Sequence, residues 1–425
     1  MNLKILLAAA ALACPAGGRA EPPAVTMDWQ KCLEEAVRQN PSLASARAQV
    51  AQAVEQVAET RSALLPELSG RASWSHSKSS GESGSDRYSY SISGDQLIFD
   101  GLDSWYRTGR QQQNLLSSRY SYRLTSASVR QSLREAYIDL IESQELLTMS
   151  EEIARRRKQQ LDMVQLRYEA GNEHRGSLMT SQANLADARF DVDKARRDIL
   201  LAQRNLSREI GRATFTPITV EGSLVSPPVP AQIPPIEEIA RVHPSTRQQE
   251  ALLEAAEYDL KSARAGFFPS IRASASLGRS GDEWPPDSES WSTGVSLSLP
   301  IFTGGSRLAE VNKSEAALTE QKEDARETWN DTIYYLEHAW KSLLDEDARV
   351  GIQKQYLEAD EERAKIAEAQ YATGLLSFDN WIIIEDNLVS TRKSDLSSRA
   401  DALRAWAEWE YRTGLTMESE LSGEN

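Results

Sequence analysis

The stretch Ile301-Phe302-Thr303-Gly304 decides the fold, because an earlier stretch of the chain carries the same pattern. Ile98-Phe99-Asp100-Gly101 precedes it by about 203 residues. The same offset relates four further landmarks: Asn40-Pro41-Ser42 with His243-Pro244-Ser245, Leu65-Pro66 with Phe268-Pro269, Tyr168 and Gly171 with Tyr371 and Gly374, and Ile210-Gly211 with Thr413-Gly414. Chance matches would scatter in offset. The sequence therefore predicts two copies of one structural unit.

The first residues of the chain predict an export signal. Lys4 precedes an apolar run at 5–13 that is too short to span a bilayer, and the small residue Ala20 suits cleavage. We therefore expect residues 1–20 to be a signal peptide. An alternative is lipidation of Cys14, since the residues before it loosely resemble a lipobox. After cleavage only Cys32 remains, which excludes an internal disulfide.

Composition narrows the class of protein further. The net charge of −15 argues against nucleic-acid binding, which needs a basic surface. No run of about 18 apolar residues follows the signal, so we expect no transmembrane helix. An exported acidic chain of this kind suits a soluble periplasmic protein or an outer-membrane β-structure.

Each unit contains two segments that alternate in polarity. Ile271, Ala273, Ala275 and Leu277 alternate with Arg272, Ser274 and Ser276, for example. Such alternation over about ten residues is typical of a strand between lipid and water, and a soluble hairpin with one buried face remains the alternative. We expect strands at about 67–77 and 88–99 in the first unit and at about 270–280 and 291–302 in the second.

Long helices follow the strands in both units. No proline occurs from 102 to 168 or from 307 to 371, and about 65 helical residues would span roughly 100 Å. The second of these helices has a coiled-coil seam at Trp329, Ile333, Leu336, Trp340 and Leu343. Gly171 and Gly374 are expected to end the two long helices in the left-handed backbone conformation. After each glycine, a second helix runs back along the first.

These elements give a domain plan. The first repeat covers 21–211 with a helical hairpin at about 102–210, and the second covers 236–414 with a hairpin at about 307–413. A proline-rich connector spans 212–235, and 415–425 form a C-terminal tail. Four strands cannot close a barrel, and lipid does not tolerate open sheet edges. If these are membrane strands, several chains must share one barrel, and a ring of hairpins would continue it as a tube.

The chain resembles the TolC family of outer-membrane efflux proteins over nearly its whole mature length. The resemblance rests on the Asn40-Pro41 hinge, the stops at Pro66 and Pro269, the Pro300-Ile301-Phe302-Thr303-Gly304-Gly305 strand exit and the paired Tyr-x-x-Gly turns. It implies a mainly α fold with a β-barrel part. It also implies a homotrimer with a 12-stranded barrel in outer-membrane lipid and a periplasmic α-helical barrel. Its implied partners are a periplasmic adaptor (membrane fusion) protein and an inner-membrane pump of the RND or ABC type.

The resemblance also implies functional residues. The residues expected to meet the adaptor lie at the two hairpin turns: Arg167, Tyr168, Gly171, Ser177, Gln370, Tyr371, Gly374, Leu375, Leu376 and Ser377. A pore gate with cation selectivity is expected at Asp379, with Glu385 and Asp386 one to two turns further on. Trp381 to Ile384 are apolar where some family members have a second acid, which puts a double acidic ring in doubt.

Motifs for catalysis, cofactors or metals are not found in the sequence. The histidines are His76, His174, His243 and His338, and no two of them have metal-ligand spacing. The basic run from Arg155 to Lys158 follows Glu151 and Glu152 by one turn, which favours a salt-paired helix surface.

We therefore expect a passive exit duct rather than an enzyme. It would conduct small molecules such as drugs, toxic compounds or metals from a pump to the exterior. Two alternatives stay open: the exit duct of a type I protein secretion system, and a soluble periplasmic coiled-coil adaptor or scaffold.

Overall fold

A computed structural model describes residues 25–78, 80 and 84–422. The predicted signal peptide at 1–20, its cleavage site at Ala20 and the alternative lipidation of Cys14 lie outside the described residues. The first repeat contains β1 (Val25–Met27), α1 (Trp29–Gln39), α2 (Pro41–Ser62), β2 (Glu67–Ser77), β3 (Ser85–Phe99), α3 (Asp103–Glu169) and α4 (Arg175–Ile210). The remaining elements are β4 (Ile218–Val220), α5 (Ile236–Val242), α6 (Pro244–Ala265), β5 (Ser270–Gly281), β6 (Ser288–Ser298), α7 (Ser306–Thr373), α8 (Phe378–Arg412) and α9 (Met417–Ser422).

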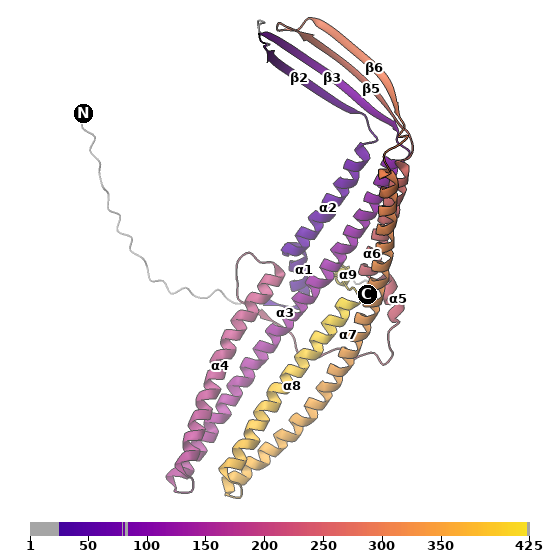
Figure 1. The fold of residues 1–425 in the computed structure, drawn as a ribbon. Helices are drawn as coiled ribbons and strands as arrows, with labels where there is room; N and C mark the ends of the chain where they lie inside the picture. Colours follow the sequence, from indigo (N-terminus) through magenta and orange to yellow (C-terminus); the bar gives the residue numbers. More distant parts are fainter. Residues whose placement is uncertain (1–24, 79, 81–83, 423–425) are drawn as a thin grey trace, which may run out of the picture.

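The chain is arranged as stacked layers, as Figure 1 shows. The sheet and the two helical layers each contain four elements. At one end β2, β3, β5 and β6 form an antiparallel sheet in that order. Below it α2, α3, α6 and α7 pack in sequence, and further down the order is α4, α3, α8 and α7. The long helices α3 and α7 belong to both helical layers. Each layer takes two elements from each repeat and has two open edges.

The sheet has one apolar and one serine-rich face, and both run across all four strands. Gly70, Ile92, Leu277 and Trp291 lie opposite one another in a single cross-strand row. The neighbouring row on the opposite face is Ser69, Ser93, Ser276 and Ser292, with hydroxyl contacts of 2.8 Å between Ser69 and Ser93 and 2.9 Å between Ser276 and Ser292. The alternation in the sequence therefore becomes a continuous apolar surface.

Local sequence signals set the helix ends. The Asn40 side chain accepts hydrogen bonds from the backbone N–H groups of Ser42 (2.9 Å) and Leu43 (3.2 Å), and Pro41 begins α2. Proline suits a first helical position because its missing N–H would be unpaired there in any case. In the second repeat, His243 caps α6 in the same way before Pro244.

The apolar core lies midway along the helices, a level we call the equator. Its larger cluster joins α1, α2, α3, α4, α8 and α9 with the two short strands β1 and β4. A smaller cluster joins α5, α7 and α8 around Leu336, Trp340 and Leu343, three of the predicted seam residues. Trp329 and Ile333 pack against this smaller cluster from its edge.

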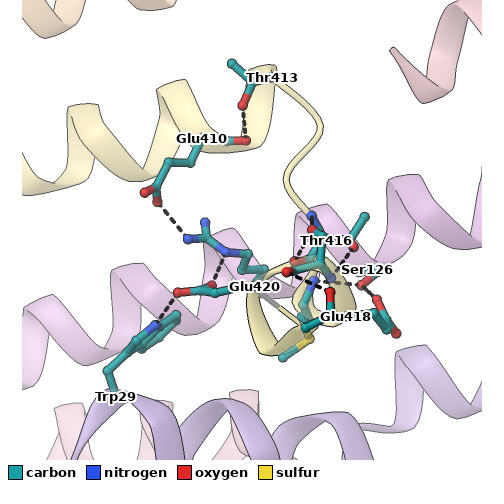
Figure 2. A network of polar contacts seen from close by, with 11 residues as sticks. Trp29, Ser126, Glu410, Thr413, Thr416, Glu418 and Glu420 are labelled. Atoms are coloured by element: carbon teal, nitrogen blue, oxygen red, sulfur yellow. Dashed lines mark hydrogen bonds and ion pairs between the residues drawn. The ribbon is translucent and has the colours of Figure 1, made fainter. Parts of the chain in front are cut away.

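The helix α9 completes the larger core with a polar network, shown in Figure 2. The Glu420 carboxylate accepts hydrogen bonds from the Trp29 indole (2.8 Å) and the Arg130 guanidinium. Arg130 also pairs with Glu410 at 2.8 Å, and Ser126 donates to Glu418. Met417 is fully buried, and its backbone N–H donates to Ser126 Oγ at 3.1 Å. Helix α9 is thereby fixed to the first repeat.

Several boundaries differ from the expectations. β3 begins at Ser85 rather than 88. β6 spans Ser288–Ser298 rather than 291–302, and it ends before Pro300 because proline cannot donate a hydrogen bond to a neighbouring strand. The connector contains β4, which pairs in parallel with β1. Most of the expected tail forms α9, and residues 423–425 lie outside the described part.

Candidate functional site

The two hairpin turns lie side by side at the end of the molecule opposite the sheet (Figure 1). The α3–α4 turn contains Gly171 with φ +74°, and the α7–α8 turn contains Gly374 with φ +79°. In that backbone region a side chain is unfavourable, so glycine permits both chain reversals. We call these two turns the tips.

A buried aromatic cluster holds the tips together. The ring of Tyr371 stacks on Trp381 with centroids 4.2 Å apart, and Phe378 packs edge-on against both rings. All three side chains are almost fully buried, together with Val164 of α3. Stacked and edge-on aromatic pairs each contribute about 0.5–1.5 kcal/mol beyond their area of burial.

Polar contacts then connect this cluster to the first repeat. The Tyr371 hydroxyl donates to Glu173 Oε2 at 2.9 Å, and Arg167 Nη1 donates to the Tyr371 carbonyl oxygen at 2.7 Å. The Arg167 guanidinium also lies 4.7 Å from the centre of the Tyr371 ring. The sequence predictions included Arg167 and Tyr371 but omitted Glu173 and Trp381. Nothing in the local pattern indicates that Glu173 meets Tyr371 of the other repeat or that Trp381 stacks on Tyr371.

The protonation states favour the bond between Tyr371 and Glu173. Burial alone would raise the pKa of Glu173, but hydrogen bonds from Tyr371, the His174 N–H and Ser177 hold it below its usual range. Burial and the bond to Glu173 raise the pKa of Tyr371. The carboxylate is therefore an ionised acceptor and the phenol a protonated donor throughout the neutral range.

The other predicted tip residues divide into exposed and structural groups. Leu375 is 81% exposed, Gln370 and Tyr168 are also exposed, and Leu376 lies partly buried against the aromatic cluster. Ser177 is buried, where its hydroxyl donates to Glu173, and Ser377 caps α8 by accepting from the Asn380 N–H. Leu375 and Gln370 form a small apolar and amide surface at the turn of the second repeat, and Tyr168 lies exposed beside the turn of the first.

The three predicted gate residues lie on two different faces of α8. Asp379 and Asp386 share an exposed stripe with Ile383, whereas Glu385 is 1% exposed. The Glu385 carboxylate accepts from Arg156 of α3 at 2.6 and 2.7 Å and from Gln160 at 2.6 Å. Asp379 has no ion-pair partner among the residues that the structure describes. The gate assignment stays a prediction, and Glu385 has the geometry of a link between the two hairpins.

The basic run of α3 differs from its interpretation as a local salt-paired surface. Arg155 does pair within its helix with Glu152, at 3.9 Å. Arg156 and Arg157 instead reach across to Glu385 and Asp386 of the second repeat. The interpretation is wrong for these two residues, because the helix turns them towards α8 rather than towards their own acids.

Over the described ranges, 25–78, 80 and 84–422, no group of three or more His, Cys, Asp or Glu is placed to hold a metal ion. None of the helices that the structure describes is both long enough and apolar enough to cross a membrane.

The elongated hairpins, the two-faced sheet and the paired tips define a membrane-associated protein built from tandem repeats. The chain belongs to the outer membrane efflux protein family, whose profile matches residues 32–212 and 236–408. This match includes both repeats. It places the protein in the outer membrane rather than among soluble adaptors, so that alternative from the sequence is wrong.

Relatives with different substrates resemble the chain to a similar degree. The alkaline protease secretion protein AprF of Pseudomonas aeruginosa is 25% identical over 85% of this chain and 79% of its own length. The cation efflux system protein CusC of Escherichia coli O6:H1 is 24% identical over 85% of this chain and 80% of its own length.

Solved structures share the fold. A crystal structure of CusC superimposes with a TM-score of 0.81 at 19% identity, covering 94% of this chain and 95% of CusC. The open state of the MtrE outer membrane channel of Neisseria gonorrhoeae gives a TM-score of 0.79 at 21% identity, covering 91% of this chain and 88% of MtrE. The predicted architecture of tandem repeats, each a β-hairpin with a long helical hairpin, is confirmed.

Proposed function

We propose that three copies of this chain form the outer-membrane exit duct of a tripartite efflux system. The observation that carries the proposal is the open four-stranded sheet with one continuous apolar face. Such a sheet cannot stand alone in lipid, and three copies supply twelve strands, enough to enclose a lumen. Membership of the outer membrane efflux protein family supports the same conclusion.

The exposed tip surface is the proposed docking site for a periplasmic adaptor, which would connect the duct to an inner-membrane pump of the RND or ABC type. Leu375 is an apolar anchor raised on a glycine turn, and the buried Tyr371 cluster holds that turn in place. A rigid turn with an exposed leucine suits a helical hairpin as its partner, because little conformational freedom is lost on binding.

The gate is proposed at the exposed acidic stripe of α8. Asp379 lies in the first turn of α8 with its carboxylate exposed, and Asp386 follows two turns later. Three copies of Asp379 would form a ring that attracts cations, and Arg157 offsets the charge of Asp386 in each copy. Glu385 contributes by holding α8 to α3 through Arg156.

A second candidate is the exit duct of a type I protein secretion system. The resemblance to AprF, an alkaline protease secretion protein, favours it as strongly as the resemblance to CusC favours cation efflux. Both candidates use the same duct. Deletion of the gene separates them, because loss of efflux raises drug or metal sensitivity, whereas loss of secretion removes proteins from the culture medium.

The duct itself is tested by native mass spectrometry on protein extracted from purified outer membranes, followed by single-channel recording in planar bilayers. We expect a three-chain mass and a conducting pore. A monomer, or absence from the outer-membrane fraction, would overturn the proposal.

A pair of matched variants tests which face of the sheet meets lipid. Leu297 lies on the apolar face and Ser292 on the serine face of the same strand, β6. Leu297→Arg should reduce assembly in the membrane, because arginine is poorly tolerated on the lipid face of a strand. Ser292→Arg should assemble normally. Equal assembly of both variants, scored by heat-modifiable migration of the trimer, would contradict the assignment of the faces.

A further inference from the structure

The sheet carries the same kind of acid–base pair in both repeats. In the first repeat, His76 Nδ1 lies 3.0 Å from Asp86 Oδ1, across β2 and β3. In the second repeat, Arg279 Nη2 lies 3.0 Å from Glu289 Oε2, across β5 and β6. The offset of about 203 residues relates His76 to Arg279 and Asp86 to Glu289. All four residue types differ, but the pairing of a base with an acid is kept, so the pair is a repeated feature of the sheet.

Both pairs lie on the apolar face of the sheet, at the end remote from the helices. Side chains two residues apart on a strand share a face, so His76 lies on the face of Trp74, and Arg279 on the face of Leu277. β2 ends one residue after His76 and β5 two residues after Arg279, at the end of the sheet away from the helices in Figure 1. Because the helices extend into the periplasm, this end belongs to the outer leaflet of the membrane. We call it the outer rim.

Exposed tryptophans accompany the pairs at the outer rim. Trp74 is 63% exposed, and its indole N–H donates to Asp86 Oδ1 at 3.1 Å. Trp284, in the loop between β5 and β6, is 69% exposed. Its ring packs edge-on against Tyr88 and Tyr90 of β3, with centroids 6.1 and 6.4 Å apart. Each repeat therefore presents a broad aromatic surface at the outer rim.

The loop between β5 and β6 places Trp284 beside the second pair. The loop closes tightly on the end of β5, since Pro286 is buried and a Cβ added at Gly281 would lie 3.1 Å from Pro286 Cα. Tyr90 lies directly opposite Arg279 in the sheet, and its side chain shares the apolar face. The contact of Trp284 with Tyr90 thus holds the indole on the lipid side of the sheet, next to Arg279.

We propose that the outer rim binds the sugar headgroup of lipopolysaccharide in the outer leaflet of the outer membrane. This inference rests on the proposed duct, which turns the apolar face of the sheet towards lipid. A tryptophan ring combines an apolar face with an N–H donor, which suits the C–H and hydroxyl groups of a pyranose ring. A guanidinium beside a carboxylate donates to one hydroxyl and accepts from another. Each copy in the ring carries one such cluster per repeat.

The charges at the outer rim favour the sugar ring over the phosphate groups of the same lipid. Arg279 and Glu289 cancel one another, and the loop beside them carries the exposed acids Asp282, Glu283 and Asp287. A bare phosphate would be repelled by these carboxylates, whereas a hydroxyl group can donate a hydrogen bond to them. Phospholipid headgroups have no pyranose ring, so they would leave the tryptophan faces unused.

Titration of the detergent-extracted trimer with purified rough lipopolysaccharide, followed by native mass spectrometry, tests the proposal. We expect Trp284→Ala, and separately Arg279→Gln with Glu289→Gln, to raise the Kd by roughly fivefold. Trp284→Phe keeps an aromatic ring and should restore most of the affinity. Arg87→Gln is the matched control, because Arg87 lies opposite Ser75 on the serine face near the same end of the sheet. Its Kd should equal that of the native protein.

A parallel titration with phosphatidylglycerol separates recognition of a sugar from attraction of any anionic lipid. Equal affinity for the two lipids would overturn the proposal, as would one Kd shared by the native protein and all variants. An equal loss of affinity in Arg87→Gln would also overturn it, because charge alone would then explain the binding. Should Trp284→Ala fail to form trimers, Trp74→Ala applies the same test to the first repeat.

The outcomes also separate this inference from the proposed duct. A native trimer that binds no lipopolysaccharide would overturn the inference and leave the duct intact. A monomeric protein would overturn both.

Discussion

The two repeats share one arrangement of helices and strands, but different side-chain contacts hold their helices together at the equator. In the first repeat, the Asn40 amide caps α2 and also donates to the Glu209 carbonyl oxygen at the end of α4, at 2.7 Å. In the second repeat, the His243 imidazole takes the capping position and accepts from the Ser245 N–H at 3.2 Å. The Asn40 amide both accepts and donates hydrogen bonds, so it joins α2 to α4. The His243 imidazole caps α6.

The cores around these junctions differ as well. The first repeat lies in the large cluster that α9 closes, and Arg130 is buried among the acids there. The second repeat has a small cluster built on Trp340 and Trp409, whose ring centroids are 5.2 Å apart. The larger apolar core thus takes most of its residues from the first repeat, with a few from α8 and α9. Substitutions at equivalent positions should then have unequal effects, and the following predictions test that asymmetry.

The largest difference is expected at Arg130 and its counterpart Ile333. Arg130→Met leaves Glu410 and Glu420 without their partner in a mostly buried site, which should lower the free energy of unfolding by about 3 kcal/mol. Ile333→Ala removes a partly buried side chain and should cost about 1–2 kcal/mol. Guanidinium unfolding in detergent, followed by circular dichroism, measures both losses. Equal losses would contradict the asymmetry.

A smaller difference is expected at the glycines that end α4 and α8. Both have positive φ, +92° at Gly211 and +82° at Gly414, so alanine costs about 1–2 kcal/mol at either from the backbone alone. At Gly211 the added Cβ would also lie 2.5 Å from the Gln39 carbonyl oxygen, whereas at Gly414 the nearest atom is Pro244 Cδ at 2.9 Å. We therefore expect Gly211→Ala to reduce the melting temperature more than Gly414→Ala, and the reverse order would be inconsistent with this packing.

The capping histidine should make the second repeat sensitive to acid. Burial, with a smaller effect of the nearby Arg412 charge, lowers the pKa of His243 to about 4. The unfolded chain then binds the proton more readily, so His243 contributes stability above pH 6.5 that is lost as the pH falls towards 4. We expect a loss of about 1–2 kcal/mol between pH 7 and pH 5. His243→Asn, which copies Asn40, should abolish that part of the pH dependence of the melting temperature, and an unchanged profile would exclude His243 as its source.

Substitution of Asp379 is expected to have the smallest effect on stability. It should change the cation preference of the pore instead. Its counterpart in the first repeat is Gly176, so only the second repeat supplies an acid at this position of the tip. Asp379→Ala should leave the melting temperature unchanged, since the carboxylate is exposed, and should weaken the cation preference in single-channel recordings. Unaltered selectivity would remove Asp379 from the gate.

The sequence predicted those features that one repeat unit encodes locally. Alternating polarity indicated the four strands of the sheet, proline and glycine indicated the helix ends, and the seam spacing indicated that Leu336, Trp340 and Leu343 are buried. The constant offset predicted the duplicated plan. These signals are local because each depends on the conformation of a few neighbouring residues.

Contacts between distant segments could not be predicted in this way. The strands β1 and β4 have three residues each, too few for a periodic pattern, and they pair only because the core brings them together. Helix α9 is held by Arg130 and Trp29, which the sequence places far away. At the tips, the burial of Glu385 depends on Arg156 of the other repeat, so its exposure could not be judged from α8 alone.

The docking of α9 also has a consequence for the order of folding. The bond between Trp29 and Glu420 joins residues 391 positions apart. Contacts of such high sequence separation form late, because a large loop must close before they contribute. The large equatorial core therefore stays open at one side until α9 has emerged and docked. A chain interrupted before Met417 should leave that core more open to proteolysis.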